Sequence, residues 1–340
     1  MTQQKIAYIT RSEPDTSIVE SRLAGRDYQL DVHVCESQGE VIEAIKGADL
    51  IIADGGMAMP REVIEEIDTA KAIVSMGHGF NLIDHNAATE KGVMVVNTAG
   101  FVTEQVANHT IMMLLACAKQ LTRMHNVVRT GGWDKGTLAN LGHMPTIDGQ
   151  TLGIVGLGNI SRATARRAAV FGLDVIAYDP YAIPWVAKDY RVELVGSLQE
   201  LAERSDFVSI LVPLNNETRK LIDSDFFNAM KPTAYFINTC RGPVVDEAAL
   251  IAALQAGQIA GAGLDVFEVE PTPPDNPLLK MDNVIVTPHS AGTSDSSVPG
   301  GLAQIGDETA RLLSGTWPMS LANPAVREGL PPRPAAKSVP

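Results

Sequence analysis

The sequence predicts an α/β protein with two doubly wound, parallel-sheet domains. Short apolar runs alternate with helical patterns over residues 5–97, and the same alternation returns from residue 151. A glycine turn, Gly156-Leu157-Gly158, separates the first strand from the first helix of the second series. The chain has 340 residues, of which 45% are hydrophobic, so it is long enough to bury two cores.

The charge, the apolar pattern and the cysteines of the chain argue against a nucleic-acid-binding protein, a membrane protein and a metal site. The net charge is −13 and no basic stripe is visible, so a nucleic-acid surface is not expected. No segment has the pattern of a targeting peptide or of a membrane span. Cys35, Cys117 and Cys240 are scattered without metal-ligand spacing, which indicates a reducing compartment and no metal site. We therefore expect a soluble cytoplasmic protein that binds neither membranes nor nucleic acid.

The first strand–helix series occupies residues 5–97. Its apolar runs have the length of buried strands, and one of the helical patterns between them begins after Pro60. The expected strands are 6–9, 30–34, 50–53, 72–74 and 93–96, and the expected helices include 40–46 and 61–67. No glycine turn follows the first strand, so we expect a nucleotide-like fold that does not hold the nucleotide.

The second series opens with strand, glycine turn, helix, strand and acid in the spacing of a dinucleotide-binding fingerprint. Gly156 permits a tight turn, and Gly158 lets the backbone approach a pyrophosphate at the start of the helix. Asp179 can accept hydrogen bonds from a ribose diol and would repel a 2′-phosphate. The pattern predicts a Rossmann-like domain that prefers NAD to NADP. Ser161 stands where a third glycine is usual, which predicts a slightly wider helix–strand crossing.

The remaining elements complete the second series. A helical pattern over 103–118 precedes the fingerprint, and a helix over 246–256 has an Asp cap and a terminal Gly257. A last helical stretch leads from Thr293 to Gly315. The expected strands are 152–155, 175–178, 192–195, 207–212, 234–238, 263–266 and 284–287.

Residues 130–149 are rich in glycine and polar residues but carry large apolar side chains at Trp133, Leu138, Leu141 and Met144. Apolar residues on such an excursion often cover a partner, which predicts an intersubunit arm. A loop packed onto its own domain is the alternative, and the sequence favours neither.

Arg241, Glu270 and His289 each lie just beyond one of the last three expected strands. Strand carboxyl ends line the ligand crevice of an open parallel sheet, so these side chains should meet beside the nicotinamide end of a dinucleotide. A histidine can protonate the oxygen that gains charge when a ketone accepts a hydride, and a carboxylate beside it stabilises its charged form. A guanidinium can hold the carboxylate of a 2-oxo acid. Taken singly, each residue could equally be structural.

The segments that carry Arg241, Glu270 and His289, together with several others along the chain, resemble those of the D-isomer-specific 2-hydroxyacid dehydrogenases. The resemblance covers nearly the whole chain. Besides Ser161, two positions depart from the family's pattern, since Asn108 replaces a common Glu and Ser75 stands where Arg is frequent. The blocks that carry the resemblance are Gly77-His78-Gly79 with Asp84, Val106-Ala107-Asn108-His109-Thr110, Gly156-Leu157-Gly158-Asn159-Ile160, Val212-Pro213-Leu214-Asn215, Asn238-Thr239-Cys240-Arg241-Gly242, Asp265-Val266-Phe267-Glu268-Val269-Glu270-Pro271 and Thr287-Pro288-His289.

The resemblance implies a reaction and the residues that carry it out. A 2-oxo acid and a D-2-hydroxy acid would be interconverted by hydride transfer with NAD (NADH). Arg241 would hold the substrate carboxylate and carbonyl, and His289 would be the acid–base group with Glu270 as its partner. The backbone of His78 and Gly79 would cradle the substrate carboxylate.

The resemblance also implies cofactor contacts and domain limits. Asp265 would receive the nicotinamide carboxamide. The other contacts would be Val106, Gly156, Gly158, Asn159, Ile160, Asp179, Pro213, Thr218, Thr239, Cys240, His289 and Gly292. A discontinuous, flavodoxin-like substrate-binding domain would comprise 1–102 and 294–340, and an NAD-binding domain would comprise 103–293, with a cleft between them. A dimerisation arm near 120–149 would make the protein a homodimer.

The loop over residues 54–60 is similar in position to the one that faces the substrate side chain in this family. It offers Met57 and Met59 but no Arg or Lys before Pro60, so a phosphorylated substrate is not expected. A 2-oxo acid with an apolar or modestly polar side chain is favoured. Both methionines could equally be core residues.

Two other functions stay open. One is an NAD-sensing, corepressor-like binding protein, because such proteins resemble this family and keep most of its motifs. The other is a formate or phosphite dehydrogenase on the same fold. Formate enzymes that resemble this chain carry an amide where Glu270 stands, which disfavours formate but not phosphite.

Overall fold

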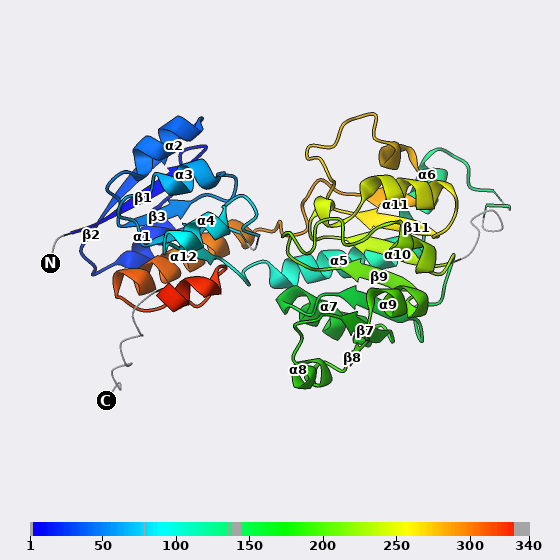
Figure 1. Cartoon of the computed structure of the whole chain (residues 1–340). Helices are drawn as coiled ribbons and strands as arrows, with labels where there is room; N and C mark the ends of the chain where they lie inside the picture. Colours follow the sequence, from blue (N-terminus) through cyan, green and yellow to red (C-terminus); the bar gives the residue numbers. More distant parts are fainter. Residues whose placement is uncertain (1–2, 78, 135, 138–143, 330–340) are drawn as a thin grey trace. The chain divides into compact units, whose positions relative to one another are not determined.

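The computed structural model of the chain describes residues 3–77, 79–134, 136–137 and 144–329. Two compact units divide the chain, one formed by Met1–Phe101 with Ser294–Pro340 and the other by Val102–Thr293. Each unit contains one all-parallel sheet with helices on its faces (Figure 1). The predicted fold class of two doubly wound parallel-sheet units is therefore confirmed. Within the described ranges, no helix combines the length and apolar character that a bilayer crossing requires.

The sheet of the first unit has five strands in the order β2-β1-β3-β4-β5, the flavodoxin type. Every residue of β3 and β4 is buried, which explains why these strands read as continuous apolar runs in the sequence. The strands are β1 (Gln4–Thr10), β2 (Tyr28–Val34), β3 (Leu50–Ala53), β4 (Ala72–Ser75) and β5 (Met94–Asn97).

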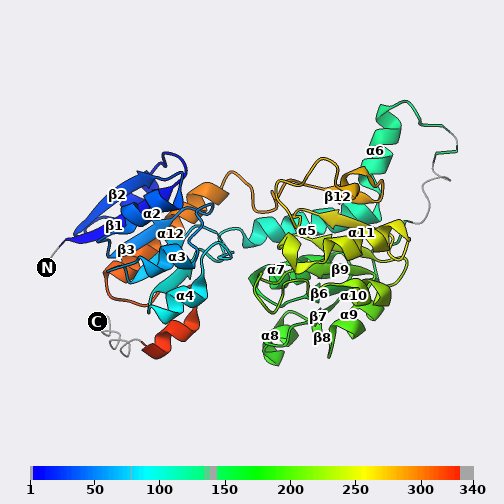
Figure 2. The same ribbon diagram turned by 45° about the horizontal axis from the view of Figure 1, so that its top comes forward.

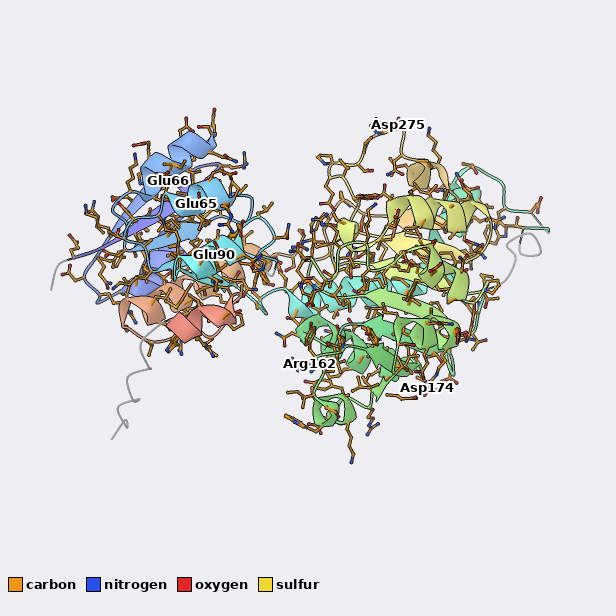
Figure 3. The ribbon with its side chains drawn as sticks, in the orientation of Figure 1. Glu65, Glu66, Glu90, Arg162, Asp174 and Asp275 are labelled. Carbon is orange, nitrogen blue, oxygen red and sulfur yellow. The ribbon has the colours of Figure 1, made fainter. Side chains whose placement is uncertain are left out.

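Helices cover both faces of this sheet. α2, α3 and α4 bury one face (Figure 2), and α1 packs with α12 on the other (Figure 1). Arg61 of α3 pairs with Glu90 of α4 at 2.8 Å, where Figure 3 labels Glu65 and Glu90 on the two helices. The helices are α1 (Ser17–Leu23), α2 (Gln38–Ile45), α3 (Arg61–Glu65), α4 (His85–Glu90) and α12 (Ser297–Leu313), followed by a short 3-10 helix, η4 (Pro324–Gly329).

The sheet of the second unit has seven strands in the order β12-β11-β10-β9-β6-β7-β8. From β6 the chain adds β7 and β8 on one side of the sheet, and it then returns to add β9 to β12 on the other side of β6. The boundary between β6 and β9 is therefore the topological switch point, where such sheets bind ligands. The strands are β6 (Thr151–Val155), β7 (Asp174–Tyr178), β8 (Glu193–Leu194), β9 (Phe207–Ile210), β10 (Tyr235–Asn238), β11 (Gly261–Leu264) and β12 (Val284–Val286).

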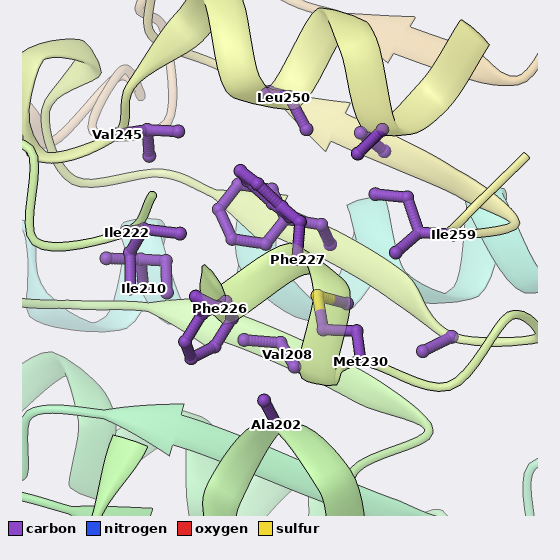
Figure 4. Close-up of a cluster of buried hydrophobic side chains, with 14 of the residues drawn as sticks. Ala202, Val208, Ile210, Ile222, Phe226, Phe227, Met230, Val245, Leu250 and Ile259 are labelled. Carbon is purple, nitrogen blue, oxygen red and sulfur yellow. The ribbon is translucent and has the colours of Figure 1, made fainter. Parts of the chain in front are cut away.

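Two apolar layers enclose this second sheet. α9, α10 and α11 bury one face around Phe226 and Phe227 (Figure 4), and α5 and α7 bury the other. The helices are α5 (Thr103–Ala118), α6 (Leu121–Arg129), α7 (Asn159–Val170), α8 (Pro184–Asp189), α9 (Leu198–Arg204), α10 (Ser224–Ala229) and α11 (Glu247–Gln255), with short 3-10 helices η2 (Gly242–Val244) and η3 (Pro277–Lys280).

The strand expected over 263–266 is displaced in the structure, where β11 begins and ends two residues earlier. Its glycines are needed for close packing. A Cβ on Gly261 would lie 2.4 Å from the Asn283 carbonyl oxygen, and one on Gly263 would lie 3.2 Å from Met113 of α5. Because hydrophobicity patterns give glycine no weight, they place this strand too late in the chain.

Candidate active site

Three loops follow β10, β11 and β12, which are neighbours in the sheet, and so reach the same edge. Arg241 lies on the first loop, Glu270 on the second and His289 on the third. Glu270 Oε2 lies 2.6 Å from His289 Nδ1, and Glu270 Oε1 accepts a hydrogen bond from the Phe267 amide at 3.0 Å. The His289 side chain is 45% exposed, so the pair is accessible from outside this unit.

The contact with Glu270 decides how His289 presents its two nitrogens. An ionised carboxylate only accepts hydrogen bonds, so Nδ1 carries the hydrogen that it donates to Glu270. Nε2 is then the nitrogen left to exchange a proton with a ligand. This orientation suits an acid–base catalyst whose partner carboxylate stabilises the imidazolium.

The backbone at His289 adopts an unusual conformation. Its φ of +50° lies in the left-handed region, which side chains other than glycine rarely adopt. Asp265 holds this turn, because its carbonyl accepts the His289 amide at 2.7 Å and its carboxylate accepts the amides of Ser290 and Ala291 at 2.9 and 2.8 Å. Non-glycine residues in such conformations persist where the surroundings enforce them, and they concentrate at functional sites.

The Arg241 loop lies directly against the loop that carries Glu270. A Cβ on Gly242 would lie 1.7 Å from the Phe267 carbonyl oxygen, so only glycine fits beside it. Arg241 Nη1 donates to the Cys240 carbonyl at 2.7 Å. Burial raises the pKa of the Cys240 thiol to about 11, so this sulfur stays protonated at neutral pH and is not a thiolate nucleophile.

The glycine turn after β6 has the features that a dinucleotide needs. Gly156 has φ +90°, and a Cβ there would lie 2.8 Å from the Leu211 carbonyl oxygen, so the turn itself requires glycine. Gly158 is different, because a Cβ there would meet no atom within 4 Å. Gly158 and Asn159 are exposed at the start of α7, which leaves open space in front of the first helical amides.

Asp179 follows β7 and faces this turn. Its Oδ2 accepts the Leu157 amide and its Oδ1 accepts the Tyr181 amide, both at 2.8 Å. Each carboxylate oxygen keeps a second lone pair for a ribose hydroxyl. The backbone turn, the open helix start and the fixed acid together fit an adenosine diphosphate moiety.

The other expected cofactor contacts lie on loops and on α5. Thr239 shares a buried hydrogen bond of 2.8 Å with the hydroxyl of Thr110. Thr218 donates to the Pro213 carbonyl at 2.6 Å and shapes the loop after β9. The remaining members of the expected set are Val106, which is buried, Ile160 in the first turn of α7, and Gly292, which packs on Val102.

In the first unit, the expected substrate residues have different outcomes. His78 lies outside the described residues. Gly79 belongs to the loop after β4, which is anchored where the Gly77 amide donates to Thr98 Oγ1 at 2.8 Å. Met57 is 4% exposed and packs in the core with Met59, so the structure supports the alternative that both are core residues. The assignment of Met57 to the substrate site stays a prediction.

Sequence reasoning missed two groups near these sites. Arg11 donates from Nε to the Gly56 carbonyl at 3.3 Å, beside the expected substrate loop. His109 contacts Thr287 at 3.0 Å, next to the His289 turn. Each contact joins segments that are distant in sequence, so no local pattern could have shown it.

A family model described as "D-isomer specific 2-hydroxyacid dehydrogenase, NAD binding domain" matches residues 111–291. The chain belongs to the D-isomer-specific 2-hydroxyacid dehydrogenases. The matched residues contain the glycine turn and the three loops that carry Arg241, Glu270 and His289. A nicotinamide dinucleotide is therefore the cofactor of this dehydrogenase.

Curated relatives and a solved structure agree with this membership. A glyoxylate reductase of Korarchaeum cryptofilum is 37% identical over 330 residues, which cover 96% of this chain and 98% of that protein. A D-3-phosphoglycerate dehydrogenase of Methanocaldococcus jannaschii is 37% identical over 295 residues, which cover 87% of this chain but 55% of that enzyme. The crystal structure of a glyoxylate reductase from Paecilomyes thermophila has a TM-score of 0.85 at 25% identity, covering 95% and 99% of the two chains. The dehydrogenase thus spans nearly all of the first relative and about half of the second.

Proposed function

We propose that this dehydrogenase interconverts a 2-oxo acid and a D-2-hydroxy acid, with NADH as the preferred reductant. The observation that carries the proposal is the contact of 2.6 Å between Glu270 and His289, on a loop edge shared with Arg241. An acid–base pair beside a guanidinium is what reduction of a charged ketone requires. The glyoxylate reductases that the chain matches over most of its length support the same class of substrate.

Each side chain has a distinct role in the proposed reaction. The bound nicotinamide supplies or accepts the hydride. His289 Nε2 delivers a proton to the ketone oxygen during reduction and removes it during oxidation, and Glu270 stabilises the imidazolium form through Nδ1. Arg241 binds the substrate carboxylate, with the backbone of His78 and Gly79 as a second anion cradle. The remaining expected contacts bind the cofactor, and Asp265, whose side chain is fully buried, contributes through the turn that it holds.

The direct test is steady-state oxidation of NADH and of NADPH by the purified chain with a panel of 2-oxo acids headed by glyoxylate. We expect turnover with NADH and slower turnover with NADPH, because Asp179 would repel a 2′-phosphate. Tight NADH binding without turnover of any 2-oxo acid would favour the corepressor-like alternative. Phosphite-dependent reduction of NAD in place of these activities would favour the phosphite dehydrogenase.

Gly158 and Gly242 provide a matched pair of substitutions. Gly158→Ala adds a Cβ into open space, so we expect the free energy of unfolding of the free protein to change by less than about 1 kcal/mol. The same Cβ obstructs the pyrophosphate, so the Kd for NADH should rise about 10- to 100-fold, the value of one charge-assisted contact. Gly242→Ala should instead lower the free energy of unfolding by about 1–3 kcal/mol, because its Cβ overlaps the Phe267 backbone. Urea titrations and NADH fluorescence titrations measure the two quantities, and an unchanged NADH affinity in Gly158→Ala would remove Gly158 from the cofactor site.

Arg11 changes the expectation for the substrate side chain. It is exposed, at the carboxyl end of β1 beside β3, and it reaches the exposed Gly56, whereas Met57 and Met59 are in the core. We therefore propose that 2-oxo acids with a second anionic group are accepted. Arg11→Gln should raise the KM for 2-oxoglutarate or oxaloacetate about tenfold, which corresponds to one charge-assisted contact, and leave the KM for glyoxylate nearly unchanged. Arg26→Gln, at another exposed arginine of the same unit, is the control; equal effects of the two substitutions would contradict the proposal.

We also propose that the protein is a cytoplasmic homodimer whose interface includes α6. This helix has no buried residue in its own unit, and Leu121 and Val128 on it are each 54% exposed. Trp133, beyond it, is 73% exposed, while Leu138 and Leu141 lie outside the described residues. Such apolar exposure is typical of a surface that a partner covers. Sedimentation velocity should show a dimer that Leu121→Glu with Val128→Glu converts to a monomer; a wild-type monomer would contradict this proposal.

A further inference from the structure

A partly buried series of polar contacts connects α5 to the loop that carries His289. His109 Nε2 on α5 lies 3.0 Å from Thr287 Oγ1, and Thr287 Oγ1 donates to Asp265 Oδ1 at 2.5 Å. The direct separation between His109 Nε2 and Asp265 Oδ1 is 3.6 Å. All of these residues belong to the second unit, and they come from three segments brought together by the β11–β12 edge of the sheet.

The hydrogen atoms in this chain can be assigned from chemistry. A carboxylate only accepts, so the single hydroxyl hydrogen of Thr287 points to Asp265. The hydroxyl oxygen of Thr287 then has only lone pairs to offer to His109, and His109 Nε2 must be the donor. Every hydrogen bond therefore runs towards Asp265, an arrangement in which successive bonds strengthen one another.

These contacts end at the carboxylate of Asp265, a charged group whose burial is unfavourable unless hydrogen-bond donors surround it. The Asp265 side chain is fully buried, and among the described residues no Lys or Arg pairs with it. Its carboxylate is satisfied by Thr287 and by the amides of Ser290 and Ala291. A buried carboxylate must keep its donors, so losing one of them would force it to move or to admit water.

Movement of Asp265 would disturb the imidazole of His289. Asp265 holds the amides on both sides of the left-handed turn, through its carbonyl at His289 and through its carboxylate at Ser290 and Ala291. That backbone conformation is intrinsically unfavourable for histidine and depends on these bonds. The direction of the imidazole towards Glu270 therefore depends on the carboxylate of Asp265.

We propose that His109 and Thr287 are positioning residues for the acid–base reaction, acting through Asp265 to hold the His289 turn. The inference rests on the proposed function, because it assigns these residues to the orientation of the proton donor. The contact of Thr287 with His289 is made by its backbone carbonyl, which accepts the His289 amide at 3.1 Å and is kept in any side-chain variant of Thr287. The contribution of the two side chains is to fix the direction of the Asp265 carboxylate and, through it, the place of the imidazole.

Two pairs of variants of the whole 340-residue chain test the proposal. His109→Phe keeps a planar ring and removes the donor, whereas His109→Gln keeps a donor close to the position of Nε2. Thr287→Val removes the hydroxyl, whereas Thr287→Ser keeps it. We expect His109→Phe and Thr287→Val each to lower kcat roughly 10- to 100-fold, the cost of a small misplacement of a catalytic group. The KM for the 2-oxo acid should change little, because these two hydrogen bonds lead to Asp265 and not to the Arg241 side chain.

The conservative variants and the double variant distinguish positioning from packing. His109→Gln and Thr287→Ser should retain kcat within about threefold, and His109→Phe with Thr287→Val should lower kcat no further than the larger single effect, since both act through one carboxylate. Full kcat in His109→Phe, or equal losses in His109→Phe and His109→Gln, would overturn the proposal.

A readout independent of turnover separates this inference from the proposed function. The imidazole resonances of His289, assigned by comparison with His289→Asn, should shift in His109→Phe and not in His109→Gln. A wild-type chain without 2-oxo acid turnover would reject the proposed function but leave this NMR test intact. Identical His289 resonances in the wild type and in His109→Phe would reject the positioning role.

Discussion

Replacing His289 by Asn should lower kcat about 10²–10⁴-fold and leave the Kd for NADH nearly unchanged. Asn keeps a polar group at the position and tolerates the left-handed backbone, where φ is +50°, so the loop should keep its conformation. What is lost is the nitrogen that exchanges a proton with the ketone oxygen. Steady-state kinetics give kcat, and a fluorescence titration gives the NADH affinity.

Glu270→Gln is the companion to this substitution. The amide can still accept a hydrogen bond from His289 Nδ1 but carries no charge to stabilise the imidazolium. We expect an intermediate loss of kcat, smaller than that of His289→Asn. Full activity in His289→Asn would mean that another group supplies the proton, and the roles assigned here would be wrong.

Replacing Arg241 by Gln should lower kcat/KM for 2-oxo acids roughly 10²–10⁴-fold. A guanidinium can make two charge-assisted hydrogen bonds to a carboxylate, each worth about 1.5–3 kcal/mol, and every 1.4 kcal/mol corresponds to about a factor of ten. Arg241→Lys keeps the charge without the planar fork and should recover only part of the loss. The measurement is kcat/KM at limiting substrate for the three forms.

A neutral substrate is the control for Arg241. The carboxylate contact is absent when the substrate is a simple aldehyde or ketone, so wild type and Arg241→Gln should reduce such a compound at similar, slow rates. A loss that is equally large with the neutral substrate would show that Arg241 maintains the loop. That result would contradict its assignment as the binder of the substrate carboxylate.

The bounds of a helix or strand could be predicted from the sequence where burial alone determines its pattern of apolar residues. β3 and α5 have the expected bounds, because a fully buried strand is a continuous apolar run and a long helix repeats its apolar positions. β11 was misplaced because Gly261 and Gly263 add nothing to an apolar pattern, although one packs closely on Asn283 and the other on Met113 of α5. Short helices such as α1, α4 and α8 were not expected, since six or seven residues show too little periodicity.

The residues of the candidate site could be predicted from the sequence, but the hydrogen bonds that hold them in place could not. The glycine turn and the three ionisable residues could be found because each follows a strand, and parallel strands end at a common edge. The hydrogen bonds around the left-handed turn of His289 could not be found. Asp265 accepts the His289 amide, and His109 contacts Thr287 beside this turn, but both partners lie far away in the sequence. The role of Met57 could not be decided from the sequence, because an apolar residue in a loop can face either the core or a ligand.

The most direct test of the account is a crystal structure of this dehydrogenase with NAD and a bound unreactive analogue of a 2-oxo acid. We expect His289 Nε2 within about 2.6–3.2 Å of the oxygen that represents the ketone, with Nδ1 still on Glu270 and the Arg241 guanidinium on the carboxylate of the analogue. An analogue bound with the imidazole of His289 out of reach of that oxygen would contradict the proposed reaction.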